Sequence, residues 1–225
     1  MDDLIADLHI HSKYSHDSLM SPEGIVKRAK KAGLSCIAIT DHDTIRGGIE
    51  GKKAGEKYGV KVIVGSEVNT DRGDIIGLNL TGEIHVTGWK EVIDTIRSQG
   101  GLVVLPHPYR DHRGVEEIAP LVDLVETGNG RSTPSQNAAA AALAARTGRL
   151  PAYGSDAHVF SEIGAVRARI DPVSYACQEV LHFRPATSAE IRNSRITSLV
   201  KQKKFGTLIV QGVRMVGRKI WWRPR

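Results

Sequence analysis

The 225-residue sequence is poor in cysteine and in aromatic residues: it has two cysteines, and phenylalanine, tryptophan and tyrosine make up 5% of the chain. Cys36 stands in the apolar run Cys36-Ile37-Ala38-Ile39, which predicts a buried thiol rather than a disulfide or a metal ligand. Aliphatic side chains must therefore fill the core, and a 40% hydrophobic content is enough for one large domain.

Other absences exclude whole classes of protein. No apolar run approaches the roughly 18 residues that a membrane span requires, and the acidic start Met1-Asp2-Asp3 is unlike a secretory signal. Glycine-rich nucleotide-binding motifs and a nucleophile-elbow serine are also missing. We therefore expect a cytoplasmic protein with no transmembrane segment and no nucleotide cofactor.

Charge is distributed unevenly along the chain. Residues 184–225 contain eleven Lys or Arg residues and one acid, Glu190, so this part carries +10 and the preceding part −4 of the formal charge of +6. Three interpretations stay open for the basic extension: a solvated face packed against the acidic remainder, a nucleic-acid contact in which Trp221 and Trp222 stack on bases, or docking at a membrane surface.

Short apolar runs alternate with amphipathic stretches, a pattern typical of a parallel α/β protein. Seven strands are expected, at Leu4–His9, Ser35–Thr40, Val60–Gly65, Asp74–Leu78, Leu102–Leu105, Leu121–Glu126 and Pro151–Ser155. Helices are expected from the cap Ser21 to Gly33 and at Arg46–Tyr58, Trp89–Ser98, Pro134–Thr147 and Ser188–Gln202. Arg167–Ile170 could add a strand, and Thr207–Val216 a strand or amphipathic segment. The periodicity weakens near Asp171-Pro172, which predicts a barrel domain over residues 1–171 and a basic extension over residues 172–225.

Histidines and carboxylates lie at or just beyond the ends of the expected strands. They are His9, His11, Asp17, His42, Glu67, His107, Asp156 and His158. The carboxyl ends of parallel strands meet at one face, so these side chains should gather there and bind divalent cations. His9 and His11 are two residues apart on a strand and should point the same way, as should Asp156 and His158. His16 competes with Asp17 as the ligand from its loop.

Several neighbouring residues have alternative interpretations. Asp41 and Asp43 flank His42 and are expected to orient imidazoles rather than bind metal, although Asp43 or Thr44 could instead cap a helix. Prolines on both sides of His107 fix its direction, and Gly154 permits close approach of the chain.

The motifs resemble those of the PHP (polymerase and histidinol phosphatase) domain family over roughly residues 4–170. They are Asp-Leu-His-Ile-His from Asp7, Ile-Thr-Asp-His-Asp-Thr from Ile39, Gly-Ser-Glu from Gly65, Pro-His-Pro from Pro106 and Gly-Ser-Asp-Ala-His from Gly154. The resemblance implies a distorted seven-stranded β/α barrel that binds three divalent ions and hydrolyses phosphate esters.

The resemblance also implies a ligand set for each ion. It assigns His9, His11, Glu67 and Asp156 to the first ion, Glu67 and His107 to the second, and Asp17, His42 and His158 to the third. Many family members have a histidine on the strand after the glutamate, where this chain has Asp74. Aspartate can bind the same ion through oxygen, so two or three ions (zinc, manganese or iron) are expected.

The expected activity is hydrolysis of a phosphate ester by a metal-bridging hydroxide, with Glu67, Asp156 and His158 as catalytic residues. Arg110 and Arg131 follow strand ends and are candidates to hold the phosphate. A small phosphorylated metabolite or nucleotide is the first choice of substrate. The alternatives are a nuclease that acts on oligonucleotides, hydrolysis of a nonphosphate bond by the same metals, and a noncatalytic metal-binding or nucleic-acid-binding module.

Overall fold

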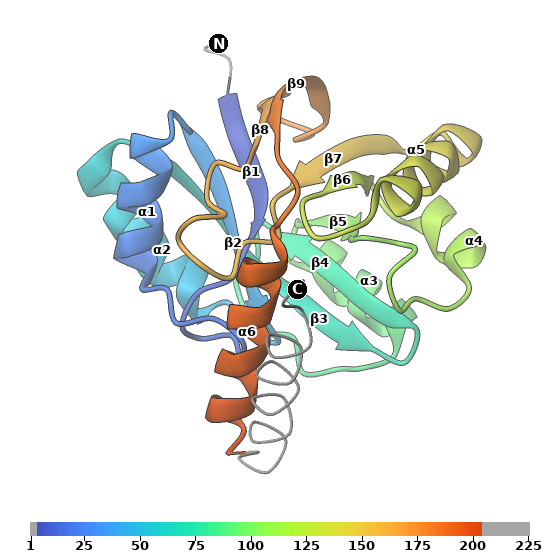
Figure 1. The fold of residues 1–225 in the computed structure, drawn as a ribbon. Coiled ribbons are helices and arrows are strands. Elements are labelled where there is room, and N and C mark those ends of the chain that lie inside the picture. The colour runs from blue at the N-terminus through green and yellow to red at the C-terminus, as the bar shows by residue number, and fades with distance from the viewer. Residues whose placement is uncertain (1–3, 204–225) are drawn as a thin grey trace, which may run out of the picture.

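Nine strands form one sheet that curves into a nearly closed barrel in the computed structural model, which describes residues 4–203 (Figure 1). The strands are β1 (Leu4–Ile10), β2 (Cys36–His42), β3 (Lys61–Thr70), β4 (Gly73–Leu78), β5 (Leu102–Leu105), β6 (Leu124–Asn129), β7 (Leu150–Gly154), β8 (Val166–Ile170) and β9 (Cys177–Phe183). Their spatial order is β7-β6-β5-β4-β3-β2-β1-β8-β9. The expected barrel-like α/β class is confirmed, but the expected count of seven strands is wrong.

The two additional strands are β8 and β9, which run antiparallel to their neighbours. The first matches the suggestion made for Arg167–Ile170. The second was not expected because its central residues are exposed on both faces, so it lacks the apolar pattern of a core strand. The boundary between residues 171 and 172 stays a prediction, while β9 extends the sheet beyond it.

Strand direction brings the strand ends to one mouth of the barrel. The set β1, β2, β3 and the set β5, β6, β7 are parallel within themselves, whereas β4 is antiparallel to both of its neighbours. The start of β4 therefore lies beside the end of β3, where Asp74 pairs with Asn69. The segment after β7 returns to β1, since His11 donates its backbone N–H to the Ala157 carbonyl at 2.9 Å.

Helices lie around the outside of the barrel, apart from the one at residues 188–201, which extends away from the strands (Figure 1). They are α1 (Pro22–Lys31), α2 (Arg46–Tyr58), α3 (Trp89–Ser98), α4 (Val115–Ile118), α5 (Pro134–Thr147) and α6 (Ser188–Lys201), with a 3-10 turn at Ala119–Leu121. The expected bounds of α2, α3 and α5 are confirmed to the residue. Ser21 caps α1 by accepting from the Gly24 N–H at 3.2 Å, and Gly33 follows the helix with φ +79°.

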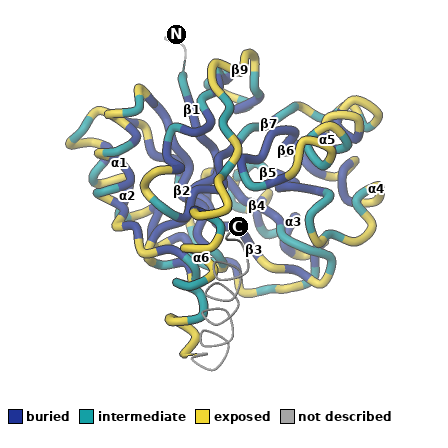
Figure 2. The backbone as a smooth tube through the Cα atoms, viewed as in Figure 1, coloured by how far each residue is buried: buried dark blue, intermediate teal, exposed yellow. Residues whose placement is uncertain are grey.

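Aliphatic side chains form three buried clusters, as the low aromatic content predicts. Most residues of the central strands are buried, whereas exposed residues lie on the surrounding helices and loops (Figure 2). One cluster lies beneath α3 and α5, and another beneath α1 and α2. The third draws its members from the strands and from Tyr175 and Ala176, so it fills the barrel interior. Cys36 belongs to this interior cluster, and both cysteines are free thiols.

An irregularity in β1 decides which of its side chains face the mouth. Leu8 packs in the interior cluster but Ile10 packs in the outer one, although residues two apart on a regular strand share a face. The pairing with β2 shifts register between Asp7 and Ile10, and this bulge reverses the alternation. His9 and His11 are thereby turned inward together.

The described part of the basic extension consists of β9 and α6. Arg184 forms an ion pair with Glu190, which also accepts from the Ser161 hydroxyl, so the start of α6 is fastened to the loop between β7 and β8. Within residues 4–203, no helix combines the length and apolar character that a membrane crossing needs. The expected segment Thr207–Val216 and the pair Trp221-Trp222 lie outside the described residues.

Candidate metal centre

Four side chains from β1, the residue that follows it, β3 and the loop after β7 converge at the barrel mouth. The Nε2 atoms of His9 and His11 are 3.0 Å apart, and they lie 3.4 and 3.3 Å from Glu67 Oε2. Asp156 Oδ1 approaches the same two nitrogens at 3.6 and 3.3 Å. All four residues are buried. The set expected for the first ion is thus brought together.

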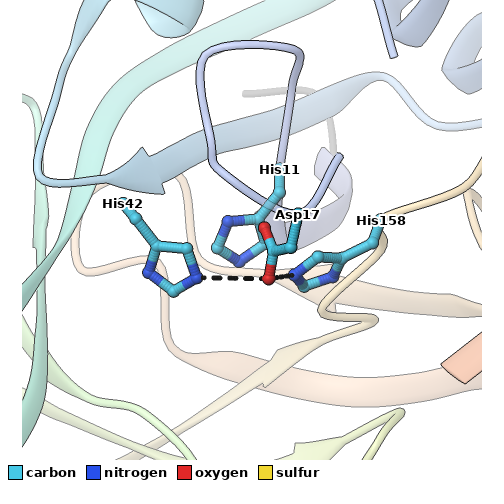
Figure 3. Close-up of side chains that lie close together, drawn as sticks. All are labelled: His11, Asp17, His42 and His158. Atoms are coloured by element: carbon cyan, nitrogen blue, oxygen red, sulfur yellow. Dashed lines mark hydrogen bonds and ion pairs between the residues drawn. The ribbon is translucent and has the colours of Figure 1, made fainter. Parts of the chain in front are cut away.

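A second convergence shares His11 with the first, and Figure 3 shows its four side chains. Asp17 Oδ2 lies 2.8 Å from His158 Nε2 and 3.6 Å from His42 Nε2, and His11 completes a group of four donors that lie within 4.8 Å of one another. His16 is half exposed and belongs to no such group among the described residues. The structure thus brings Asp17, rather than His16, to the set expected for the third ion.

The set expected for the second ion also assembles. Glu67, Asp74 and His107 each offer a donor atom within 4.8 Å of the others. Glu67 Oε1 contacts His107 Nε2 at 2.8 Å while its other oxygen faces the first set, which is the placement needed to bridge two ions. Asp74 Oδ1 accepts from the Asn69 amide at 2.9 Å, so its carboxylate is held at this position.

Hydrogen bonds at Nδ1 leave the Nε2 atoms of three imidazoles facing the centre. His9 Nδ1 donates to Glu126 at 3.0 Å, and His11 Nδ1 donates to the Ser15 hydroxyl at 3.0 Å. His158 Nδ1 donates to a backbone carbonyl two residues earlier at 2.7 Å. Partners of this kind fix the tautomer and the direction of a metal-binding imidazole.

Asp41 supports this arrangement from behind. It accepts from the Ser12 backbone N–H, from the Ser12 hydroxyl at 2.7 Å and from the Ser15 hydroxyl at 2.9 Å. Gly47 makes room for it, because a Cβ at this position would overlap the Asp41 carboxylate and the Ser12 hydroxyl. Asp41 thus orients the Ser15 hydroxyl, which in turn accepts from His11 Nδ1.

The geometry fits divalent cations. Bonds of about 2.1 Å at angles near 90–110° place neighbouring donor atoms about 3.0–3.4 Å apart, close to the spacings of the first set. Two buried polar atoms of the centre, Asp17 Oδ1 and His107 Nδ1, have no hydrogen-bond partner among the described residues. A combination of imidazole nitrogen and carboxylate oxygen suits zinc, manganese or iron.

Electrostatics keep the carboxylates of the centre charged. Burial opposes ionisation of Glu67, but His9, His42 and the other imidazoles hold its pKa well below the usual range. Burial also disfavours a charge on His11, yet its contacts with Asp156 and Glu67 raise its pKa to about 10. In the metal-free protein, protonated imidazoles thus balance the negative charge of the carboxylates. Bound cations would take over this role.

His158 responds in the opposite way. Burial and the neighbouring charge of His11 lower its pKa to about 4, so it is neutral at physiological pH. A neutral imidazole is the form that binds metal.

The centre opens into a cavity of about 350 Å³. Its lining includes the expected ligands Asp17, His42, Glu67, Asp74, Asp156 and His158, with Arg110, Asp111, Arg131, Ile191, Ser194, Arg195 and Ser198. The last four residues belong to α6, so this helix forms one wall. A second hollow, of about 530 Å³ beside α2 and β3, contains none of the expected ligands.

The two candidate phosphate-binding arginines differ in availability. Arg110 Nη2 lies 2.6 Å from Asp156 Oδ2, on the opposite side of that carboxylate from His9 and His11. Arg131 instead donates Nε and Nη2 to Glu162 and Nη1 to Ser194, so each of its nitrogens already has a protein partner.

Three features of the centre were not foreseen. Glu126 ends an expected strand, and its burial beside His9 could have been suspected from that position alone. Arg195 carried no signal beyond helical spacing in a basic segment. Asp156 and His158 follow β7 rather than lie on it, and Asp156 has φ +56°, so the expected strand geometry is wrong for this pair.

A β/α barrel with this donor set at its mouth defines a metal-binding class of protein. The PHP domain family matches residues 7–146, which is more than half of the chain, and the chain belongs to this family. Asp156, His158 and α6 lie beyond the matched residues.

Parts of this chain are similar to proteins of known sequence. An uncharacterized protein of Methanocaldococcus jannaschii is 49% identical over 115 residues, 46% of this chain and 67% of its own length. A second protein of the same organism is 32% identical over 170 residues, 70% of this chain and 67% of its own. A 5'-3' exoribonuclease of Haemophilus influenzae is 43% identical over 77 residues, which are 32% of this chain and 28% of that enzyme.

Solved structures share the fold. A two-domain protein of Bacteroides vulgatus, containing a predicted PHP-like metal-dependent phosphoesterase, superposes with a TM-score of 0.66 at 16% identity, over 87% of this chain and 70% of that one. An amidohydrolase of Chromobacterium violaceum gives a TM-score of 0.60 at 17% identity, over 85% and 96%.

Proposed function

We propose that this protein is a metal-dependent hydrolase of phosphate esters, with a small phosphorylated metabolite or nucleotide as substrate. The observation that carries the proposal is the convergence of all nine candidate ligands, in four overlapping groups of donor atoms, beside one cavity. Membership of the PHP domain family supports the same chemistry.

The proposed ligands follow the three convergences. His9, His11, Glu67 and Asp156 would hold one ion, Glu67, Asp74 and His107 a second, and Asp17, His42 and His158 a third. Bound ions would supply activation of water and neutralisation of phosphate charge. We retain Glu67, Asp156 and His158 as catalytic residues on this basis.

Side chains of the cavity wall would orient the substrate. Arg110 is partly exposed to the cavity, and its guanidinium fork can bind phosphate oxygens beside Asp156. Arg131 also lines the cavity but is more fully engaged by its protein partners. Arg195 adds a cation from α6 for which no ion pair is found among residues 4–203, so it can meet an anionic part of the substrate.

A nuclease activity is the second candidate. It is favoured by the 43% identity with part of the exoribonuclease of Haemophilus influenzae. It would use the same ligands but needs a substrate path along which a strand can pass. The basic residues beyond 203 are a proposed, separate contact for such a strand.

The test combines metal analysis of the purified protein with a panel of sugar phosphates, nucleotides and short oligonucleotides. We expect metal-dependent release of phosphate or of nucleotides, and its loss in His9→Ala. His85→Ala is the matched control, since His85 is exposed and belongs to no donor group of the described chain. Turnover that survives His9→Ala, or that needs no metal, would contradict the proposal.

A further inference from the structure

The last residue of α6 contacts the loop that carries Asp17. Lys201 Nζ lies 2.7, 2.5 and 2.9 Å from the backbone carbonyl oxygens of Lys13, Ser15 and Ser18, which precede and follow Asp17. An ammonium group has three N–H donors, so all three are used. The contact joins parts of the chain more than 180 residues apart in sequence.

These carbonyl groups belong to another segment, so Lys201 is not capping its own helix. Three carbonyl dipoles that point toward one spot repel one another unless a cation or several donors lie between them. The loop conformation that presents Asp17 to His42 and His158 therefore depends on this ammonium group.

The other side of the loop is already fixed. Asp41 holds Ser12 and Ser15, and the Ser18 hydroxyl donates to the carbonyls of His11 and His158. Asp17 lies between these anchored residues, with one carboxylate oxygen facing the imidazoles and the other unpartnered among the described residues. On the side facing α6, Lys201 fixes the loop through three of its backbone carbonyl groups.

We infer that Lys201 is a positioning residue for the metal centre: through the loop backbone it places Asp17, and so sets the affinity of the ion that Asp17, His42 and His158 would share. Occupancy of one ion then depends on docking of α6. The inference rests on the proposed metal centre but not on the nature of the substrate.

The experiment compares the full-length protein with Lys201→Met and with Lys203→Met, the matched control two residues beyond the end of α6. Lys203 has no contact of this kind in the described chain. Metal content is measured by mass spectrometry at a series of buffered free metal concentrations. We expect Lys201→Met to weaken one ion about 10-fold or more, the range seen when a supporting residue of a metal site is removed, and the control to match the wild type.

A second readout is hydrogen exchange of the metal-free proteins. Lys201→Met should exchange faster at residues 12–20 and not in the strands. Lys201→Gln, which keeps a donating amide, is the alternative if Lys201→Met folds poorly. Its metal affinity and its exchange rate in this loop should lie between those of the wild type and Lys201→Met. Unchanged affinity for every ion, or unchanged exchange in this loop, overturns the inference. Metal binding that responds to Lys201 in a protein inactive on every phosphate ester would instead contradict the proposed function alone.

Discussion

Glu126→Gln tests the centre through a residue that belongs to none of its donor groups. One Glu126 oxygen accepts from His9 Nδ1 at 3.0 Å, and the other accepts from the His107 backbone N–H at 2.8 Å and the Asn129 amide at 2.9 Å. A glutamine must direct its NH₂ group at one of these donors. Either orientation loses a hydrogen bond, and both remove the negative charge that strengthens His9 as a base.

The expected loss follows from that contact. Removal of a carboxylate partner of a metal-binding histidine costs about 10–100-fold in metal affinity, or about 1.4–2.7 kcal/mol of binding free energy. We would measure it by competition with a chromophoric chelator. Glu23→Gln is the matched control, since it makes the same charge change at a carboxylate that accepts from the Tyr58 hydroxyl and pairs with Lys27, away from the donor groups and from α6. Wild-type affinity in Glu126→Gln would refute the assigned role of the His9 contact.

Three further outcomes are expected. Removal of metal should lower the melting temperature by about 5–10 °C relative to protein with free metal at 100 times Kd. Metal at that concentration stabilises the folded state by about 2.7 kcal/mol, and each kcal/mol shifts the melting temperature of a chain of this size by about 2–4 °C. An unchanged melting temperature in calorimetry would count against a structural dependence on metal. Metal binding should release protons and strengthen as pH rises. Nearby carboxylates outweigh the effect of burial and raise the pKa of His9 and, to about 10, that of His11, so protons must leave when metal binds. Calorimetry in buffers of different ionisation enthalpy should detect this release, and its absence would contradict those protonation states. Arg195→Ala should raise KM for phosphate esters about 10-fold with little change in kcat, as measured by steady-state kinetics, whereas a fall in kcat alone would place Arg195 elsewhere in the reaction.

Local signals in the sequence specified the helices well. Ser21, Thr133 and Thr187 each accept a hydrogen bond from the first turn of the helix that they precede, and the last two form full capping boxes. Such contacts join residues three apart, so the local sequence is sufficient to predict where these helices begin. The same holds for the His-x-His spacing that brings His9 and His11 to one face.

Features that depend on distant partners were not predictable. The bulge in β1 arises from pairing with β2, and the exposed strand β9 is defined by its register with β8. Glu126 acquires its role from His9, which is 117 residues away, and Arg131 is engaged by a residue of α6. Periodicity and motifs do not indicate which residues that are distant in sequence will come into contact.

The wall that α6 contributes has a consequence for variation among relatives. Most of the candidate ligands lie within the residues that define the family, whereas Ile191, Ser194, Arg195 and Ser198 come from a helix beyond them. The floor of the cavity and its wall are therefore encoded in separate stretches of the chain. Substitutions in a single surface helix can alter the shape and charge of the entrance while every candidate metal-binding position is retained. The entrance and the candidate metal centre can therefore vary independently among relatives.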